Sequence, residues 1–409
     1  MEEERINLGT REGPDAGEER ETRSRTRSYT RASAQDEKKK KRRKRIIKTV
    51  FWIAILGIAA WFFLFGNDVV SFKGIKNFFA EIFSSGNSDQ VAALNGTSVE
   101  DVRLMGSDVL VVSDIGVMLM SGSGREMLAV QHGCAKPAVA ACGDRFLVFD
   151  RGGVRWELYS KDGLIRSGAA SYEIIDADVA SNGAMALVTS SKSYHNEVHY
   201  YDSDGAETYV WYSADNYIYK VGMKSNGKAM TALGMNSDGG ETSVTAFIFD
   251  PRSKNEPVKA LLSGNNFYYV SYKGSNVALI GSDNVLTLDG DGSVVYDYSY
   301  GGMALAGYAN TSDRTVLVLS KYGVGRDHVV VALDDDGEEE AKTDISVDFR
   351  CVSAGKSGVA VLGSHEAFVF SKRLQQENVA ETSADGSIVC LSGDTVFVFG
   401  VGSIYKINL

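Results

Sequence analysis

The 409-residue sequence has only four cysteines, Cys134, Cys142, Cys351 and Cys390, and it contains no C-x-x-C pair. Four scattered cysteines are too few for a disulfide scaffold in a chain of this length. We therefore expect buried free thiols. A bridge between Cys134 and Cys142 stays open as an alternative, because both lie near one predicted inter-strand loop.

Familiar catalytic motifs are also missing. The sequence has no G-x-S-x-G elbow, no H-E-x-x-H helix and no phosphate-binding loop, and no nucleophile is paired with a base by spacing. This absence predicts that the protein is not an enzyme and uses no cofactor. Only four prolines occur beside 43 glycines, and helical periodicity is absent after residue 90, so the chain suits hairpins better than helices.

Positive charge is scarce after residue 48. That part of the chain has 27 Lys and Arg against 43 Asp and Glu, a net charge of −16. Such an acidic domain argues against nucleic acid or anionic lipid as its ligand. The first 48 residues have the opposite balance, with 16 basic and 10 acidic residues and few apolar ones. We expect residues 1–45 to be a disordered cytoplasmic tail.

One apolar segment, residues 46–66, is long enough to span a bilayer, and it has a single charge, Lys48. Eight consecutive basic residues precede it: Lys38, Lys39, Lys40, Lys41, Arg42, Arg43, Lys44 and Arg45. Because positive charge stays inside, this pattern predicts a single transmembrane helix with the N-terminus cytoplasmic and the C-terminal domain outside. A cleaved signal peptide fits less well, since 45 hydrophilic residues come first and no A-x-A-like site follows.

Residues 67–90 predict an amphipathic juxtamembrane helix followed by a hinge at Ser84–Ser88. Apolar side chains recur there at helical steps, at Phe72, Ile75, Phe79, Ile82 and Phe83. Such a helix would lie in the outer membrane interface, or it would pack against the outer domain. In the tail, the hydroxyls of Thr26, Ser28 and Thr30 alternate with arginines and are candidate phosphorylation sites.

Polar hairpins with glycine at a fixed place recur after Val99. Five clear copies are Met120–Gly124, Tyr159–Gly163, Tyr201–Gly205, Leu288–Gly292 and Leu333–Gly337, and looser copies are Phe249–Lys254 and Phe370–Leu374. A second unit, a turn followed by an apolar strand, occurs eight times: Gly106–Val112, Gly143–Phe149, Asn182–Val188, Asn226–Leu233, Gly274–Ile280, Ser312–Val318, Gly358–Leu362 and Asp385–Leu391. These turns and apolar runs are typical of strands joined by tight hairpins.

Four short strands in each unit of about 40 residues, repeated in this way, predict an all-β fold, a β-propeller over residues 91–409. The copies indicate eight blades, with seven as the alternative. The last unit, Asp385–Leu409, is short. We therefore expect residues 91–105 to supply one of its strands and close the ring.

Hairpins such as Val285–Tyr296 and Val330–Glu338 resemble the repeat of quinoprotein-like (PQQ-like) propellers. The whole chain looks like a family of membrane-anchored bacterial propellers of unknown function. Quinone enzymes of this type carry a regular tryptophan in each repeat and an adjacent cysteine pair. Here only Trp156 and Trp211 occur in the repeats, and no two cysteines are neighbours, so the resemblance implies the fold and not quinone chemistry.

Two groups of residues are weak metal candidates. His195, Glu197 and His199 would share one face of a strand and could ligate a transition metal. Polar residues that face water explain this pattern more simply. The acidic run Asp334–Glu340 could bind calcium, but Asp and Gly are also the residues that hairpin turns require. We expect no bound metal.

The features together predict a membrane protein that presents a propeller as a binding or scaffolding platform for an envelope protein at the bacterial cell surface. An envelope sensor or carbohydrate reader is the alternative, with stacking aromatics among Tyr217, Tyr219, Phe267, Tyr268, Tyr269 and Tyr272. An enzyme is the third class. The lipid bilayer, contacted through residues 46–66, is a further expected partner, and nothing in the sequence decides the oligomeric state.

Overall fold

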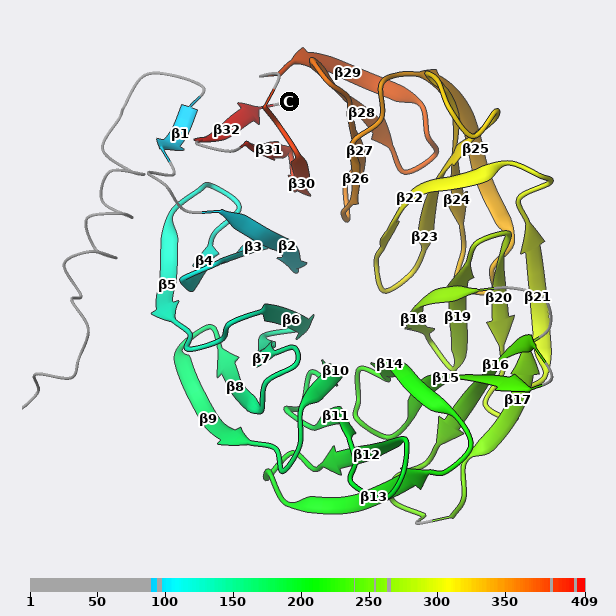
Figure 1. Ribbon diagram of the computed structural model, residues 1–409. Coiled ribbons are helices and arrows are strands. Elements are labelled where there is room, and N and C mark those ends of the chain that lie inside the picture. The colour runs from blue at the N-terminus through cyan, green and yellow to red at the C-terminus, as the bar shows by residue number, and fades with distance from the viewer. Residues whose placement is uncertain are drawn as a thin grey trace, which may run out of the picture. The chain divides into compact units, whose positions relative to one another are not determined.

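From Gln90 onward the chain folds into short antiparallel strands arranged around a central axis (Figure 1). This computed structural model describes residues 90–93 and 98–408, except 239, 254, 263–265, 383–384 and 401–402. The described residues form 32 strands and no helix, so no helix among them could cross a membrane. The predicted tail at 1–45, transmembrane helix at 46–66 and juxtamembrane helix at 67–90 lie, up to residue 89, outside the described residues.

The strands form eight four-stranded sheets, which confirms the prediction of eight blades. Blade 1 comprises β2 (Val99–Met105), β3 (Asp108–Ser113), β4 (Gly116–Met120) and β5 (Glu126–Gln131). Blade 2 comprises β6 (Pro137–Cys142), β7 (Arg145–Asp150), β8 (Arg155–Ser160) and β9 (Gly163–Ala169). Blade 3 comprises β10 (Ile174–Val179), β11 (Met185–Ser190), β12 (Asn196–Tyr201) and β13 (Glu207–Ser213). Blade 4 comprises β14 (Tyr217–Met223), β15 (Met230–Asp238), β16 (Glu241–Phe249) and β17 (Val258–Leu262).

The second half of the ring repeats the same arrangement. Blade 5 comprises β18 (Phe267–Lys273), β19 (Asn276–Gly281), β20 (Asn284–Leu288) and β21 (Val294–Ser299). Blade 6 comprises β22 (Ala304–Asn310), β23 (Thr315–Ser320), β24 (Asp327–Leu333) and β25 (Glu339–Ser346). Blade 7 comprises β26 (Cys351–Ala354), β27 (Gly358–Leu362), β28 (Glu366–Ser371) and β29 (Gln376–Glu381). Blade 8 comprises β30 (Ile388–Ser392), β31 (Thr395–Phe399), β32 (Ser403–Asn408) and β1 (Gln90–Ala93).

Blade 8 closes the ring with strands from both ends of the described region. Its first three strands come from the C-terminal end, and β1 pairs antiparallel with β32 as the outer strand. This confirms that a segment near residue 91 completes the last blade. Closure removes the long open edge that an incomplete ring of sheets would leave.

The core lies between the blades. Eight clusters of buried apolar residues occur, and each joins one pair of neighbouring blades. Second strands such as β3, β23 and β27 have no exposed residue, because both of their faces contact an adjacent blade. This explains why they are read in the sequence as continuous Val, Leu and Ala runs and not as alternating ones.

The antiparallel order gives the ring two different faces. Turns between first and second strands, and between third and fourth strands, all lie on what we call the turn face, for example 106–107, 143–144, 202–206, 289–293 and 334–338. Loops between second and third strands, and the connections between blades, lie on the opposite loop face, for example 114–115, 151–154, 191–195, 214–216 and 321–326. Both repeating units recognised in the sequence therefore belong to the turn face.

One copy of the second unit precedes a different strand of its blade from the other seven copies. The Asp-Gly at residues 385–386 is followed by an apolar strand, as the pattern predicts. In the structure it belongs to the connection before β30, which is the inner strand of blade 8, and the corresponding turn is at 393–394. Asp-Gly suits both kinds of connection, so local turn chemistry could not distinguish them.

The acidic hairpins are held by their own first aspartate. Asp334 Oδ1 accepts the amide hydrogens of Asp336 and Glu338 at 3.0 and 2.9 Å. Asp202 and Asp289 bind the amides two and four residues ahead in the same way. The glycine that follows, Gly337 in the first case, has φ +91°, a conformation that disfavours other residues. These contacts support turn formation as the role of the acidic run.

Replacing Asp334 by alanine is expected to lower the free energy of unfolding by about 1 kcal/mol, because two amides lose their side-chain acceptor at a partly exposed turn. Asp335→Ala is the matched control, since Asp335 is exposed and makes no hydrogen bond in the described structure. Urea denaturation of the full chain measures both variants. Equal losses would show that the Asp334 contacts do not stabilise the hairpin.

Candidate functional site

The innermost strands of blades 1, 3, 4 and 5 share a local irregularity that positions polar side chains. The pairing register with the second strand shifts by one residue between Val99 and Asp101, and a similar shift occurs just before Asp176, Lys220 and Tyr269. Bulges of this kind re-aim the following side chain. Asp101, Asp176, Lys220 and Tyr269 thus occupy equivalent positions in blades 1, 3, 4 and 5, and all four line one cavity.

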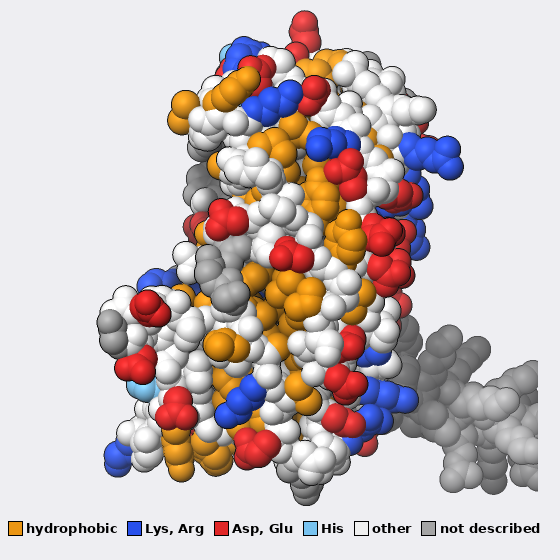
Figure 2. Space-filling view, turned by 90° about the vertical axis from the view of Figure 1, so that its right-hand side faces the viewer, with side chains coloured by type: hydrophobic (Ala, Val, Ile, Leu, Met, Phe, Trp, Pro, Cys, Tyr) orange, Lys and Arg blue, Asp and Glu red, His pale blue; other side chains and the backbone are white. Residues whose placement is uncertain are grey.

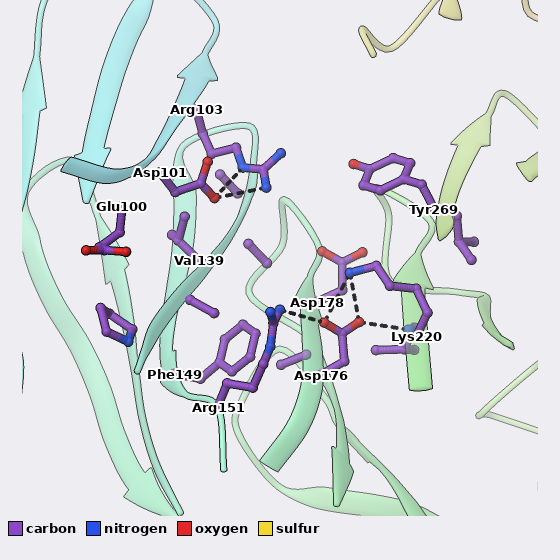
Figure 3. Close-up of a pocket in the computed structure, with 17 residues that line it drawn as sticks. Glu100, Asp101, Arg103, Val139, Phe149, Arg151, Asp176, Asp178, Lys220 and Tyr269 are labelled. Carbon is purple, nitrogen blue, oxygen red and sulfur yellow. Dashed lines mark hydrogen bonds and ion pairs between the residues drawn. The ribbon is translucent and has the colours of Figure 1, made fainter. Parts of the chain in front are cut away.

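This cavity has a volume of about 360 Å³ and lies along the inner strands of blades 1 to 5 (Figure 3). Seven charged residues line it: Glu100, Asp101, Arg103, Arg151, Asp176, Asp178 and Lys220. Arg151 follows β7 on the loop face, and the lining residues of the inner strands extend from near the loop-face end, as at Glu100 and Pro137, to past the middle, as at Asp178. The cavity therefore extends from the middle of the ring toward the loop face. We call it the central cavity.

Asp176 is the most strongly held carboxylate of the central cavity. Its side chain is only 3% exposed and is within 3.0 Å of Lys220 Nζ and 3.5 Å of Arg151 Nη2. The backbone amide of Val221 donates to its Oδ2 at 3.0 Å. Asp176 is on β10 of blade 3, whereas Lys220 and Val221 are on β14 of blade 4. This carboxylate therefore links two inner strands that are not joined by backbone hydrogen bonds of one sheet.

Asp101 and Arg103 form a second, more accessible pair on β2. The Arg103 Nε and Nη2 atoms both lie 2.9 Å from Asp101 Oδ2, and the two side chains are 32% and 46% exposed. Although burial opposes its charge, Asp101 and the nearby hydroxyls of Tyr269 and Tyr308 raise the pKa of Arg103. The surroundings of this guanidinium thus favour positive charge.

Asp178 differs from both of these carboxylates. The amide of Met223 donates to its Oδ2 at 2.6 Å and the amide of Val179 to its Oδ1 at 2.9 Å. Among the described residues, no Lys or Arg lies within ion-pair distance of it. Burial raises the pKa of Asp178 to about 6, although the two amides and Lys220 act in the opposite direction.

The loop face carries exposed apolar and aromatic side chains. Its loops include Tyr322 and Val324, which are 76% and 82% exposed, and further exposed residues at the loop ends of strands or in loops are Ile115, Val154, Tyr194, Tyr212, Tyr217, Met235 and Tyr268. The rings of Tyr194 and Tyr212 contact each other, with centroids 5.0 Å apart. Tyr217 and Tyr268 begin the inner strands that supply Lys220 and Tyr269, so they flank the central cavity.

The turn face is built differently. None of the exposed large apolar side chains among the described residues lies in its turns. Neighbouring turns bind each other: the Ser181 amide and hydroxyl donate to the Ser225 carbonyl at 2.8 and 2.7 Å, and Ser357 Oγ donates to the Gly393 carbonyl at 2.6 Å. Along the rim, seen on the side of β21 in Figure 2, apolar side chains alternate with charged ones.

The structure separates the predicted metal candidates. His199 contacts Glu197 at 3.3 Å and Glu207 at 2.7 Å through different ring nitrogens, whereas His195 is exposed in the loop before β12. Within the part of the chain that the structure describes, no group of three or more His, Cys, Asp or Glu residues is arranged to hold a metal ion. His199 is instead a polar link between two glutamates.

The aromatic cluster and the cysteines also have defined places. Phe267 is in the core, and Tyr219 donates to its carbonyl at 2.9 Å. The Tyr272 hydroxyl lies 2.8 Å from Thr231 Oγ1. Tyr217 and Tyr268 are the exposed members of the cluster, and Tyr269 lines the central cavity. All four cysteines are free thiols, so no bridge joins Cys134 and Cys142.

Apart from Tyr269, which belongs to the predicted aromatic cluster, the polar and charged residues of the central cavity were not identified by the sequence analysis. A signal is nevertheless present: Asp101 with Arg103, and Asp176 with Asp178, are charged pairs two residues apart in the first strand of a repeat. Such pairs lie on one face of a strand. A first strand whose side chains faced only solvent or only the apolar core would not require charged residues at both positions of such a pair.

Eight four-stranded antiparallel sheets arranged around one axis define the class of β-propeller proteins. Within this class the chain belongs to a family of unknown function, DUF5711, whose model matches residues 84–409. No curated protein matches the chain.

Solved structures support the same fold. The C-terminal WD40 domain of Sif2 matches with a TM-score of 0.53 and 10% identity, covering 76% of this chain and 100% of that one. Sqt1 of Saccharomyces cerevisiae matches with a TM-score of 0.50 and 10% identity, covering 77% of this chain and 97% of that one. BamB from Moraxella catarrhalis has a TM-score of 0.47, 12% identity and coverages of 76% and 94%. At 10% identity the first two matches establish the propeller fold alone.

Proposed function

We propose that this chain is a single-pass membrane protein whose propeller is a protein-binding platform at the bacterial cell envelope. The observation that carries the proposal is the unequal character of the two faces. The loops of the loop face contain five exposed large apolar side chains, Ile115, Val154, Tyr194, Tyr322 and Val324, whereas the turns of the opposite face contain none among the described residues, and exposed apolar residues occur there only in strands that follow the turns, such as Leu164 and Val294. Exposed apolar groups beside polar ones are typical of surfaces that bind proteins.

The sequence supports the membrane part of this proposal. The basic run at 38–45 and the apolar segment at 46–66 favour an anchor with the propeller outside the cytoplasm. The closed ring contributes rigidity, since every pair of neighbouring blades shares a buried cluster. A rigid scaffold with loops on one face suits recognition of a partner of defined shape.

Site-specific photo-cross-linking in cells that express the full chain tests this platform. p-Benzoylphenylalanine replaces Tyr217 or Tyr322 on the loop face, and in the control variants it replaces Asp204 or Asp291 on the turn face. All four positions are exposed. We expect the two loop-face variants to yield the same protein adduct, at least fivefold more abundant than any adduct from the turn face. Equal adducts from both faces, or no protein adduct from either, would contradict the proposal.

A carbohydrate reader is the second candidate. The observation that favours it is the exposed ring pair of Tyr194 and Tyr212, whose planes are inclined by 36° at a centroid distance of 5.0 Å. Exposed tyrosine rings offer flat apolar surfaces with a polar edge. Binding of soluble cell-wall fragments that is lost in Tyr212→Ala, without any protein adduct from Tyr217 or Tyr322, would favour this reading over the platform.

A further inference from the structure

The central cavity contains two carboxylates whose charge no cation among the described residues balances at contact distance, the exposed Glu100 at its edge and the partly buried Asp178. Asp101 is paired with Arg103, and Asp176 with Lys220 and Arg151. Asp178 receives only the two backbone amides of Val179 and Met223. Each of its oxygens has one further lone pair, and its side chain is partly accessible from the cavity. A carboxylate held in this way is a fixed acceptor for a donor that enters the cavity.

An aromatic wall lies opposite this carboxylate. The Arg103 guanidinium, the Tyr269 hydroxyl and the Asp178 carboxylate point toward the same part of the cavity (Figure 3). The ring of Tyr269 packs at 5.4 Å from that of Tyr308 and already has the Lys220 ammonium 5.8 Å from its centroid. No hydrogen bond to the Tyr269 hydroxyl occurs among the described residues. Carboxylate and tyrosine together are a combination that recognises organic cations.

The electrostatics of the cavity agree with this arrangement. Four carboxylates and three cationic side chains line the cavity. Burial raises the pKa of Tyr269 to about 12, with Asp178 and Asp176 acting in the same direction and Arg103 against it. Because the carboxylates outnumber the cationic side chains by one, the lining carries a net negative charge when all seven groups are ionised.

We propose that the central cavity binds an organic cation, an ammonium or guanidinium group, that pairs with Asp178 and packs against Tyr269. At about 360 Å³ the cavity is at the small end of ligand pockets, so it suits a side-chain-sized group. Two sources carry this chemistry: a free small molecule, and a lysine or arginine side chain of a protein bound on the loop face. The inference rests on the cavity and not on the proposed platform.

The direct test uses n-butylguanidinium as the probe and n-butylurea, its neutral counterpart of similar shape, as the control. Each compound is titrated into the purified full-length chain at pH 7.5 and followed by calorimetry or saturation-transfer NMR. We expect n-butylguanidinium to bind at least tenfold more tightly than n-butylurea. Asp178→Asn should reduce its affinity at least tenfold, and Asp394→Asn, which changes an exposed carboxylate of the turn face, should leave it unchanged. Equal binding of the two compounds, or unchanged affinity in Asp178→Asn, overturns the proposal.

Two further measurements keep the test decisive if Asp178→Asn does not fold, because asparagine can accept only one of the two amide hydrogens. Tyr269→Leu removes the aromatic wall and should weaken the probe several-fold. In the unaltered chain, affinity should fall from pH 7.5 to pH 5 as Asp178 takes up a proton. The charged and titratable groups around Asp178 are Asp176 on its own strand, Lys220 on β14, Tyr269 and Tyr272 on β18, Cys142 on β6, Glu100, Asp101 and Arg103 on β2, and Arg151 after β7. If the affinity for n-butylguanidinium is unchanged both in Tyr269→Leu and at pH 5, the proposal is overturned.

The cross-linking variants distinguish the two sources. If the cation is a side chain of the bound protein, Asp178→Asn combined with the Tyr217 cross-linker will lose the adduct. If the cation is a small molecule, probe binding will depend on Asp178 while the adduct is unaffected. Failure of the platform alone would remove the adduct from all variants and leave the probe titration intact.

Discussion

Replacing Asp176 by alanine is expected to lower the free energy of unfolding by about 3–5 kcal/mol. The side chain is 3% exposed, and its loss leaves the Lys220 ammonium, 23% exposed, and the Val221 amide without their acceptor. Removing one partner of a buried ion pair destabilises the fold by far more than the intact pair stabilises it, because the remaining charge stays desolvated. Urea denaturation of the full chain at pH 7 measures the change.

Asp101→Ala is the matched control for this prediction. Asp101 occupies the equivalent position in blade 1, but its pair with Arg103 is 32% and 46% exposed, so solvent screens it. We expect a loss of about 1 kcal/mol or less. In a double variant, Asp176→Ala with Lys220→Met should recover part of the stability by removing the orphaned charge. Equal losses at positions 101 and 176 would show that burial of the ion pair is not what matters.

Replacing Lys273 by methionine is expected to lower the free energy of unfolding by about 2–3 kcal/mol at pH 7. Lys273 is 2% exposed at the end of β18, and its ammonium donates to Asn310 Oδ1 at 3.3 Å, to the Thr311 carbonyl and to the Arg314 carbonyl at 2.8 Å. Asn310 and Arg314 keep other donors, from Thr315 and Thr311. The partly buried Thr311 carbonyl would be left without a donor.

The pH dependence of this loss tests whether the titratable amino group of Lys273 contributes to it. Burial lowers the pKa of Lys273 to about 8, below the value of about 10.4 in an unfolded chain. Between these two values the unfolded state holds a proton that the folded state has released, so the unfolding free energy rises with pH. The methionine variant lacks this gain. The stability difference should therefore grow by up to about 3 kcal/mol between pH 8 and pH 10.4.

Lys228→Met serves as the control, because Lys228 is exposed on the turn face and its side chain makes no contact in the described structure. Its stability should match that of the unaltered chain at every pH. Other groups that titrate above pH 8 are present in all three proteins and cancel in the comparison. A constant difference between pH 7 and pH 10 would show that Lys273 acts through packing alone.

Local chemistry explains why so much of the fold could be predicted. The turns at Asp202, Asp289 and Asp334 use contacts within five residues, and the following glycines hold φ of +77° to +91°. The apolar second strands are continuous because both faces are covered in every blade. Turns and strands of this kind repeat with the period of one blade, so counting them gave the number of blades.

The candidate site was less accessible, because it depends on distances around the ring. Asp176 meets Lys220 across 44 residues, and Arg103 meets the tyrosines of blades 5 and 6 only because the ring brings their inner strands around one axis. The histidine trio shows the converse error of sequence reasoning. Alternation placed Glu197 and His199 on one face correctly, but β12 begins at Asn196, and His195 lies in the loop before it.

The sequence by itself determined the strands, the tight turns, the eight repeats and the acidic character of the propeller, since each follows from residues close together in the chain. The anchor at 46–66 is a prediction of the same local kind. Only the tertiary structure decided that both repeating turns share one face, that exposed tyrosines mark the other, and that β1 completes blade 8. It also left Asp178 as a partly buried cavity carboxylate without a contacting cation among the described residues. Those outcomes depend on how eight sheets close around an axis, and closure is a property of the whole ring that no local pattern contains.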